Sequence, residues 1–244
     1  GAAWARDGRG RHVITTAIER SSVADSCTWL ERRGFEVTRT PTEEHGRIHA
    51  ADVLDALRDD TILVTVQGAN HEVGTLQPLA ELGAALADHG TYLHTDAASA
   101  AAWVPLDVRD LGVDLLSLSG GRMFGPKGIG ALYVRSRKPR VRLEPLIHGG
   151  GGERGMRGGG LNVPGAVGLG RAAEIAREER EVDRTRVAAL RDALERAVLD
   201  GVDGASVLGD RARRLPSAVP TTSPTINAVS PRSAIAAGDA TPRW

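Results

Sequence analysis

The sequence has one cysteine, two lysines and no long apolar run. The single cysteine, Cys27, excludes an internal disulfide framework and a cysteine-rich metal site. No apolar run approaches the roughly 20 residues that a membrane-spanning helix needs. Residues 1–10 also lack the apolar core of a signal peptide. We therefore expect a cytoplasmic protein that does not cross a membrane, and we expect no metal site.

The chain also lacks an excess of charge of either sign. Its 31 basic and 31 acidic residues give a formal net charge of zero, which does not favour nucleic acid or an anionic membrane as a partner. Only Lys127 and Lys138 are lysines, and the other 29 basic residues are arginines. Any chemistry that needs a lysine amine must therefore use one of these two. We interpret Lys127 as a loop residue and Lys138 as a surface charge.

An alternation of short β-branched runs with amphipathic stretches fills most of the chain. Ser21 or Ser22 caps a predicted helix that Gly34 ends, and the spacing of Cys27 from Val23 places the cysteine on the buried face. Such alternation is typical of a doubly wound α/β fold. The predicted strands cover residues 12–17, 35–40, 61–67, 91–95, 113–118 and 129–134, and the predicted helices cover about 21–33, 50–58, 78–89 and 164–199.

A glycine-rich loop, SLSGGRMFGPKGIG at residues 117–130, connects two apolar runs that predict buried strands. Its glycines allow positive φ angles and a close approach of the backbone to a ligand. Loops of this kind usually carry the functional site. Neither G-x-G-x-x-G after the first predicted strand nor G-x-x-x-x-G-K-[ST] is present, which argues against Rossmann and P-loop nucleotide sites.

This loop resembles that of the cysteine desulfurases, pyridoxal-phosphate (PLP) enzymes of the class V aminotransferase group. Their loop reads SGHK, a hydrophobic pair and GPKG, and this chain reads SGGRMFGPKG from Ser119. The resemblance implies that Ser119 binds the cofactor. It also places Gly121 at the position of the catalytic histidine and Arg122 at that of the Schiff-base lysine. A guanidinium stays protonated, with a pKa above about 12, and cannot attack an aldehyde. No catalytic residue of this loop is therefore intact.

Other segments extend the resemblance to the PLP site. GANHEVG, residues 68–74, is similar to the family segment HxNNEIG, which implies that Asn70 binds the cofactor; we interpret the neighbouring His71 as a loop-surface residue. TYLHTDAASA is similar to HxDxxQ, which implies that Asp96 pairs with the pyridine nitrogen and strengthens the electron sink. Ser99 stands at the glutamine position of this motif. Arg20, in AIER, stands where the family has a histidine that stacks on the ring.

The segment at residues 146–162 resembles the family motif HGGGxERGxRSGTxN. Gly160 replaces a threonine that in the family reaches the cofactor phosphate of the neighbouring subunit. The residues that follow predict a charged helix, with Leu190 and Leu194 on one apolar face and a solvated Glu/Arg-rich run at 177–186.

The resemblance covers about residues 11–216. It implies a three-layer α/β/α fold with a mostly parallel central sheet, similar to the large domain of fold-type I PLP-dependent transferases. We therefore assign residues 1–216 to this domain. The assignment leaves it incomplete at its N-terminus and without the family's small domain, which carries the nucleophilic cysteine. Residues 217–244 lack periodicity, and we expect them to form a disordered tail.

Three functional hypotheses remain open. The chain is an inactive cysteine-desulfurase homologue, a non-catalytic scaffold that holds a partner, or a PLP enzyme with altered chemistry that uses Lys127. The family reaction removes sulfur from L-cysteine for sulfur and iron–sulfur cluster supply, and we expect no such turnover by this chain alone. The resemblance further implies PLP bound non-covalently at best, a homodimer, and a sulfur-acceptor or iron–sulfur scaffold protein as partner.

Overall fold

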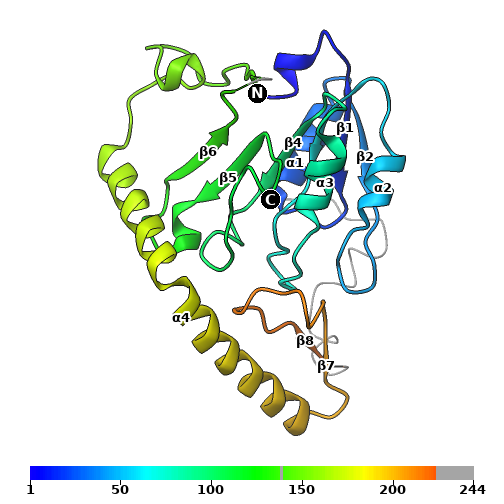
Figure 1. Ribbon diagram of the computed structural model, residues 1–244, viewed down its shortest axis with the longest axis vertical. Helices are drawn as coiled ribbons and strands as arrows, with labels where there is room; N and C mark the ends of the chain where they lie inside the picture. The colour runs from blue at the N-terminus through cyan, green and yellow to red at the C-terminus, as the bar shows by residue number, and fades with distance from the viewer. Residues whose placement is uncertain (138–139, 224–244) are drawn as a thin grey trace.

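The computed structural model describes residues 1–137 and 140–223, and a six-stranded sheet forms its centre (Figure 1). The sheet order is β2-β1-β3-β4-β5-β6. The first five strands are parallel and β6 runs antiparallel to β5. The strands are β1 (His12–Thr16), β2 (Glu36–Thr40), β3 (Thr61–Thr65), β4 (Tyr92–Asp96), β5 (Leu115–Ser119) and β6 (Gly130–Val134). The predicted mostly parallel sheet is confirmed.

Helices cover both faces of the sheet, because successive side chains on a strand point to opposite faces. Ile14 belongs to a core with α2 (Ala50–Asp55) and α3 (Leu79–Leu86). Its neighbour Val13 packs on the other face with Cys27 of α1 (Ser21–Glu31). Cys27 is 3% exposed, as the helical spacing predicted. The predicted three-layer α/β/α arrangement is therefore confirmed.

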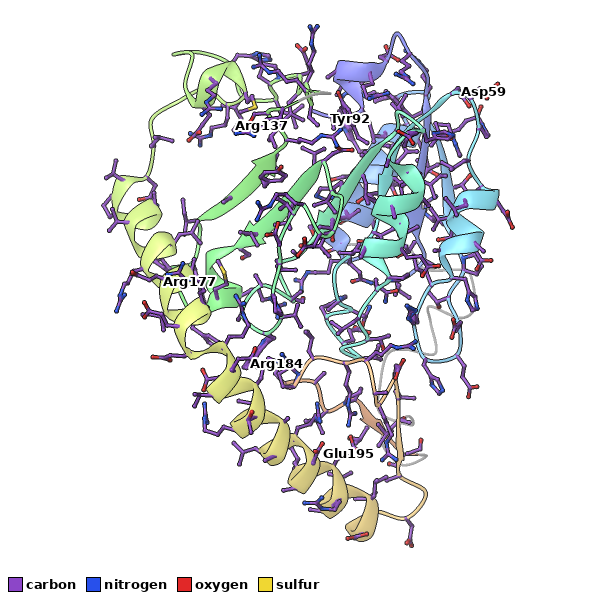
Figure 2. The ribbon with its side chains drawn as sticks, viewed as in Figure 1. Asp59, Tyr92, Arg137, Arg177, Arg184 and Glu195 are labelled. Atoms are coloured by element: carbon purple, nitrogen blue, oxygen red, sulfur yellow. The ribbon has the colours of Figure 1, made fainter. Side chains whose placement is uncertain are left out.

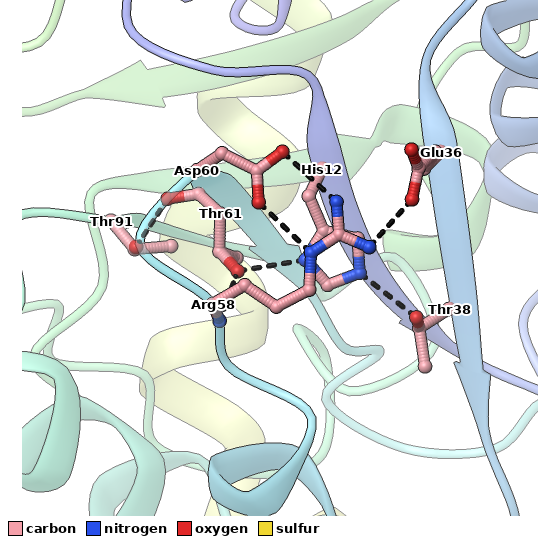
Figure 3. A network of polar contacts seen from close by, with 7 residues as sticks. All are labelled: His12, Glu36, Thr38, Arg58, Asp60, Thr61 and Thr91. Atoms are coloured by element: carbon pink, nitrogen blue, oxygen red, sulfur yellow. Dashed lines mark hydrogen bonds and ion pairs between the residues drawn. The ribbon is translucent and has the colours of Figure 1, made fainter.

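The amino ends of the strands are held together by a buried histidine (Figure 3). His12 is fully buried, and its ring nitrogens contact the hydroxyl oxygens of Thr61 at 2.7 Å and Thr38 at 2.8 Å. The imidazole therefore ties β1 to its two neighbours, β3 and β2. Burial, and next the charge of Arg58, lower the pKa of His12. A neutral ring donates from one nitrogen and accepts at the other, and the two hydroxyl groups can fill both roles.

A long helix, α4 (Val163–Gly201), runs diagonally beside the sheet (Figure 1). The apolar face that the sequence predicted on it, formed by Val187, Leu190, Leu194 and Val198, is partly open. Leu190 is 60% and Leu194 is 53% exposed, while the two valines are half-buried. The buried residue in this half of the helix is Glu195, which accepts hydrogen bonds from Arg211 at 2.7 Å and Arg214 at 2.6 Å (Figure 2). These ion pairs clamp residues 209–215 to the helix.

The remaining elements are short. The 3-10 turns are η1 (Trp4–Arg6), η2 (Gly120–Met123) and η3 (Glu153–Gly155), and β7 (Ser206–Val207) pairs antiparallel with β8 (Thr221–Thr222). The strand β8 lies inside the predicted tail. The rest of that tail, residues 224–244, lies outside the described residues, as does Lys138, so the boundary at residue 216 stays a prediction.

Candidate functional site

The carboxyl ends of β1, β3, β4 and β5 lie at one edge of the sheet because these strands are parallel. Ligands of open α/β sheets bind at this edge. Each strand is followed here by residues that the sequence analysis singled out. These are Arg20 after β1, Asn70 after β3, Asp96 and Ser99 at the end of β4, and Ser119 and Arg122 at the end of β5.

Asp96, the last residue of β4, is buried at this edge with an exposed fraction of 8%. Its Oδ1 accepts a hydrogen bond from the backbone N–H of Ala98 at 2.9 Å, and its Oδ2 accepts one from the Ser22 hydroxyl at 3.4 Å. Ser22 lies in the first turn of α1, where the helix dipole favours a negative charge. A carboxylate has about four acceptor positions, so Asp96 retains capacity for a ligand that donates a hydrogen bond.

Asn70 shapes the loop that follows β3. Its side-chain oxygen accepts hydrogen bonds from the N–H groups of Glu72 and Val73, both at 2.9 Å, and its Nδ2 donates to the carbonyl of Ile18 at 3.2 Å. The Asn70 amide thus closes its own loop and joins it to the turn between β1 and α1. One N–H of its amide group remains for a ligand.

The glycine-rich loop leaves β5 through η2. A Cβ on Gly120 would lie 2.7 Å from the carbonyl oxygen of Pro126, so the loop requires glycine there. Arg122 lies in η2 and is exposed. A Cβ on Gly121 would meet only Lys127, whose Cγ would be 3.5 Å away, an ordinary contact distance. The stem of Lys127 therefore runs beside Gly121, and position 121 has room for a side chain.

His71 lies among the charged groups of the site. Burial lowers its pKa, and the charges of Arg20 and Arg122 lower it further, while Glu72 and Asp96 act in the opposite direction. The residue is exposed in the loop after β3, as the loop-surface interpretation expected, although its side chain is 26% exposed. The charges of Arg20, Arg122 and Asp96 act on it there.

His94 was missed by the sequence analysis. Its ring nitrogens contact the hydroxyl oxygens of Thr65 at 2.7 Å and Ser117 at 2.8 Å, which links β3, β4 and β5. Burial lowers the pKa of His94 to about 4, so the ring is neutral at physiological pH. It points to the same face as Asp96, two residues later. The available signal was a polar residue near the end of each of three successive predicted strands: Thr65, His94 and Ser117.

Glu19 was also missed. Its Oε1 accepts hydrogen bonds from the N–H of Gln67 at 2.8 Å and the hydroxyl of Thr16 at 2.9 Å. Burial, together with a smaller effect of the Asp96 charge, raises the pKa of Glu19 to about 7. Its position directly after a predicted strand, next to Arg20, was the signal that could have found it.

Several buried polar atoms at this edge have no hydrogen-bond partner within the described part of the chain. Buried polar groups are normally paired, so such atoms need an explanation. A small polar ligand that reaches the carboxyl ends of the strands would satisfy them. The atoms are Glu19 Oε2, Arg20 Nη1, Gln67 Oε1 and Ser99 Oγ.

A cavity of about 630 Å³ lies behind η2, between Trp103, Phe124 and residues of α4 such as Ile175. None of the predicted cofactor residues lines it. Phe124 has a left-handed φ of 60° and packs edge-on against Trp103, with ring centroids 5.9 Å apart. The cavity therefore borders the loop that carries Arg122 and is separate from the polar edge.

We searched residues 1–137 and 140–223 for membrane-spanning helices and for metal-binding groups. In this range no helix is long and apolar enough to cross a membrane. The same residues contain no group of three or more histidine, cysteine, aspartate or glutamate side chains placed to hold a metal ion.

The fold and its polar edge define an α/β protein with a ligand site at the carboxyl ends of a mostly parallel sheet. The aminotransferase class-V family model matches residues 2–236, and the chain belongs to this family. Among curated proteins, the chain is 48% identical over 216 residues to the cysteine desulfurase IscS of Anaeromyxobacter dehalogenans (strain 2CP-C), covering 88% of this chain and 53% of that protein. It is 43% identical over 211 residues to human cysteine desulfurase, covering 86% and 46% of the two chains.

Solved structures give the same result. The structure of DndA from Streptomyces lividans superposes with a TM-score of 0.80 at 40% identity, over 87% of this chain and 59% of that one. A NifS-like protein gives a TM-score of 0.82 at 35% identity, over 88% and 58%. The family is thus that of the cysteine desulfurases, which are PLP-dependent enzymes. The chain spans about half the length of the curated relatives it matches.

Proposed function

We propose that this chain is a cysteine-desulfurase-like PLP-binding domain that holds the cofactor non-covalently and does not desulfurate cysteine alone. The observation that supports this most is Arg122, which lies in η2 at the end of β5, where the family loop has its Schiff-base lysine. An arginine keeps a positive charge and hydrogen-bond donors at this position but supplies no nucleophilic amine.

The residues at the edge of the sheet fit the non-covalent groups of PLP. The Asp96 carboxylate retains acceptor capacity for the protonated ring nitrogen. Arg20 and Ser99 present buried donors without partners, Nη1 and Oγ. Ser119 and the remaining amide N–H of Asn70 add two more donors. When bound, PLP supplies an electron sink. The chain's residues would hold and orient the ring, and Asp96 would keep the ring nitrogen protonated.

Proton transfer is also reduced by the substitutions. Gly121 replaces the histidine of the family loop, and general acid–base catalysis is typically worth about 10²- to 10⁴-fold in rate. His71 is an imidazole on which the charges of Arg122 and Asp96 act. It stays neutral and could accept a proton, but without a covalent cofactor there is no reaction for it to serve.

The test compares the wild-type chain with Arg122→Lys. Each protein is incubated with PLP, reduced with borohydride and digested, and the modified peptide is identified by mass spectrometry. We expect no reduced adduct at position 122 in the wild type and an adduct on the new lysine in the variant. Adding Gly121→His, for which the backbone has room, should increase the rate of adduct formation. Sulfide release from L-cysteine by the wild type would refute the proposal.

A second candidate function is covalent PLP chemistry through Lys127. The observation that favours it is the position of the Lys127 stem beside Gly121, one residue before Arg122. In the same mapping experiment this alternative gives a wild-type adduct on Lys127 that Lys127→Arg abolishes. An adduct-free wild type excludes this alternative and leaves non-covalent binding.

The partner assignments are also proposals. We infer a cytoplasmic homodimer that contacts a sulfur-acceptor or iron–sulfur scaffold protein, either as an inactive homologue or as a dedicated scaffold. Exposed apolar residues at the start of α4 support an interface, since Leu161 and Val163 are each 60% and Val167 is 67% exposed. Analytical ultracentrifugation should show a dimer, and Val167→Glu should dissociate it. A monomeric wild type would contradict the inference.

A further inference from the structure

Glu19 has an unusual hydrogen-bond pattern for a carboxylate. Both of its hydrogen bonds, from the N–H of Gln67 and the hydroxyl of Thr16, go to Oε1. Oε2 is buried and has no partner among the described residues. An ionised carboxylate shares its charge between both oxygens, and each of them accepts hydrogen bonds from donors. An Oε1 that accepts two hydrogen bonds beside an Oε2 that accepts none is the arrangement expected of a carboxyl group that carries its proton on Oε2.

The hydrogen bonds of Glu19 also fix the turn between β1 and α1. The carbonyl of its neighbour Ile18 accepts from the side-chain amide groups of Gln67 at 2.8 Å and Asn70 at 3.2 Å. Three hydrogen bonds therefore join residues 18–19 to the segment after β3, and a fourth, from the Thr16 hydroxyl to Glu19, closes the turn itself. Arg20 follows directly, so the placement of its guanidinium at the site depends on this turn.

Two charged or titratable groups face Glu19 from neighbouring elements. Asp96, at the end of β4, acts on the Glu19 carboxyl through its negative charge. Cys27, on α1, feels the charge of Glu19 in turn, but burial raises the pKa of this thiol and keeps it neutral. Asp96 is therefore the charged neighbour whose state depends on a bound ligand.

We propose that Glu19 is a positioning residue of the cofactor site that holds an exchangeable proton on Oε2, and that ligand binding at Asp96 is coupled to this proton. The coupling has a definite sign. A ring nitrogen that carries a proton beside Asp96 adds positive charge near Glu19, which favours loss of the Glu19 proton. Affinity for such a ligand therefore rises with pH through neutrality. Each unit by which the ligand lowers the Glu19 pKa corresponds to about a tenfold rise.

The test uses 4′-deoxypyridoxine 5′-phosphate, which has the ring and the phosphate of the cofactor but no aldehyde. Dissociation constants are measured between pH 5.5 and 8.5 for the wild type, Glu19→Gln, Glu19→Leu and the exposed control Glu44→Gln. The Gln variant keeps an acceptor at Oε1 but cannot titrate. We expect it to match the wild type at pH 5.5 and to fall below it at pH 8.5. The Leu variant, which lacks the acceptor, should bind more weakly at every pH.

If the dissociation constants of the wild type and Glu19→Gln depend on pH in the same way, the coupling is overturned. If Glu19→Gln and Glu19→Leu bind with equal affinity at pH 5.5, the positioning role is overturned. The coupling rests on the proposed cofactor site, so failure of the wild type to bind would refute both. The proton itself is tested without ligand. The stability of Glu19→Gln relative to the wild type should rise on the order of 100-fold in folding equilibrium constant from pH 4.5 to 8. No such rise would show that Glu19 holds no proton.

Discussion

The clamp between α4 and residues 209–215 gives a prediction that separates a buried ion pair from surface pairs on the same helix. The Arg214 side chain is 4% exposed and that of Glu195 is 8% exposed. Nε and Nη1 of Arg214 have no partner among the described residues. Glu195→Ala would remove the close counter-charge of this buried guanidinium and leave it the half-exposed Asp192, whose carboxylate is 4.0 Å away. Removal of one partner of a buried pair typically costs about 3 to 5 kcal/mol, a large part of the roughly 5 to 15 kcal/mol that stabilises a domain.

The matched control is Glu181→Ala, on the same helix. Glu181 pairs with Arg184 at 3.3 Å, and its side chain is 76% exposed (Figure 2 labels Arg184). An exposed pair of this kind is worth at most about 1 kcal/mol. Urea denaturation gives the two free energies of unfolding, and limited proteolysis reports whether residues 209–215 detach. If Glu195→Ala costs no more than the control, the clamp does not stabilise the protein and our reasoning is wrong.

The clamp also predicts a pH dependence. Burial raises the pKa of Glu195, but hydrogen bonds from Arg214 and Arg211 outweigh it and hold the pKa below its usual range. A lowered pKa in the folded state contributes stability above the unfolded-state value, about 4.3, and the contribution is lost as the pH falls through the folded value. Replacing both partners, with Glu195→Leu and Arg214→Met, should restore most of the stability and remove this acid sensitivity.

The remaining predictions concern the sheet and two glycines. His94→Asn should flatten the pH dependence of stability between about pH 6.5 and 4, because in that window the histidine is protonated in the unfolded state, while the buried ring, whose pKa is about 4, stays neutral; an unchanged slope would contradict this. Gly83→Ala in α3 should destabilise by about 1 to 3 kcal/mol, since its Cβ would meet the Leu111 carbonyl. Gly170→Ala in α4, where nothing lies within 4 Å, should stabilise by up to about 1 kcal/mol. Thermal unfolding distinguishes the two glycine variants.

The pH slopes of Glu19 and His94 have opposite signs in nearly the same window. Stability contributed by protonated Glu19 is lost as the pH rises from about 4.5 to about 7, whereas that of neutral His94 is lost as the pH falls from 6.5 to about 4. The two effects partly cancel in the wild type. The contribution of one group is therefore obtained from the difference in stability between the wild type and the variant of that group at each pH.

The sequence predicted the positions of the six sheet strands along the chain, because each is a short apolar or β-branched run. The expectation that the run at residues 129–134 forms a buried strand was wrong: β6 lies at the edge of the sheet and is exposed or half-buried along its length. Motif spacing also led to Asp96, which the structure places at the strand edge. The roles of Glu19 and His94 could not be predicted, since they depend on neighbours from β3 and β5 that are distant in sequence. The same reason explains α4, where the sequence favoured Leu190 and Leu194 as the packed face. Residues 209–215 instead bind the helix at Glu195, through ion pairs from Arg211 and Arg214.

The histidine at the amino ends of the strands has a consequence for how this protein can change. His12 and its two threonine contacts hold β1, β2 and β3 at the end opposite the polar edge. Part of the free energy that keeps β1, β2 and β3 in register is therefore supplied away from the polar edge. Arg122 and Gly121 lie after β5 and make no contact with this anchorage. Under the proposed function, Arg122→Lys and Gly121→His should therefore change the chemistry of the loop and leave the His12 contacts intact.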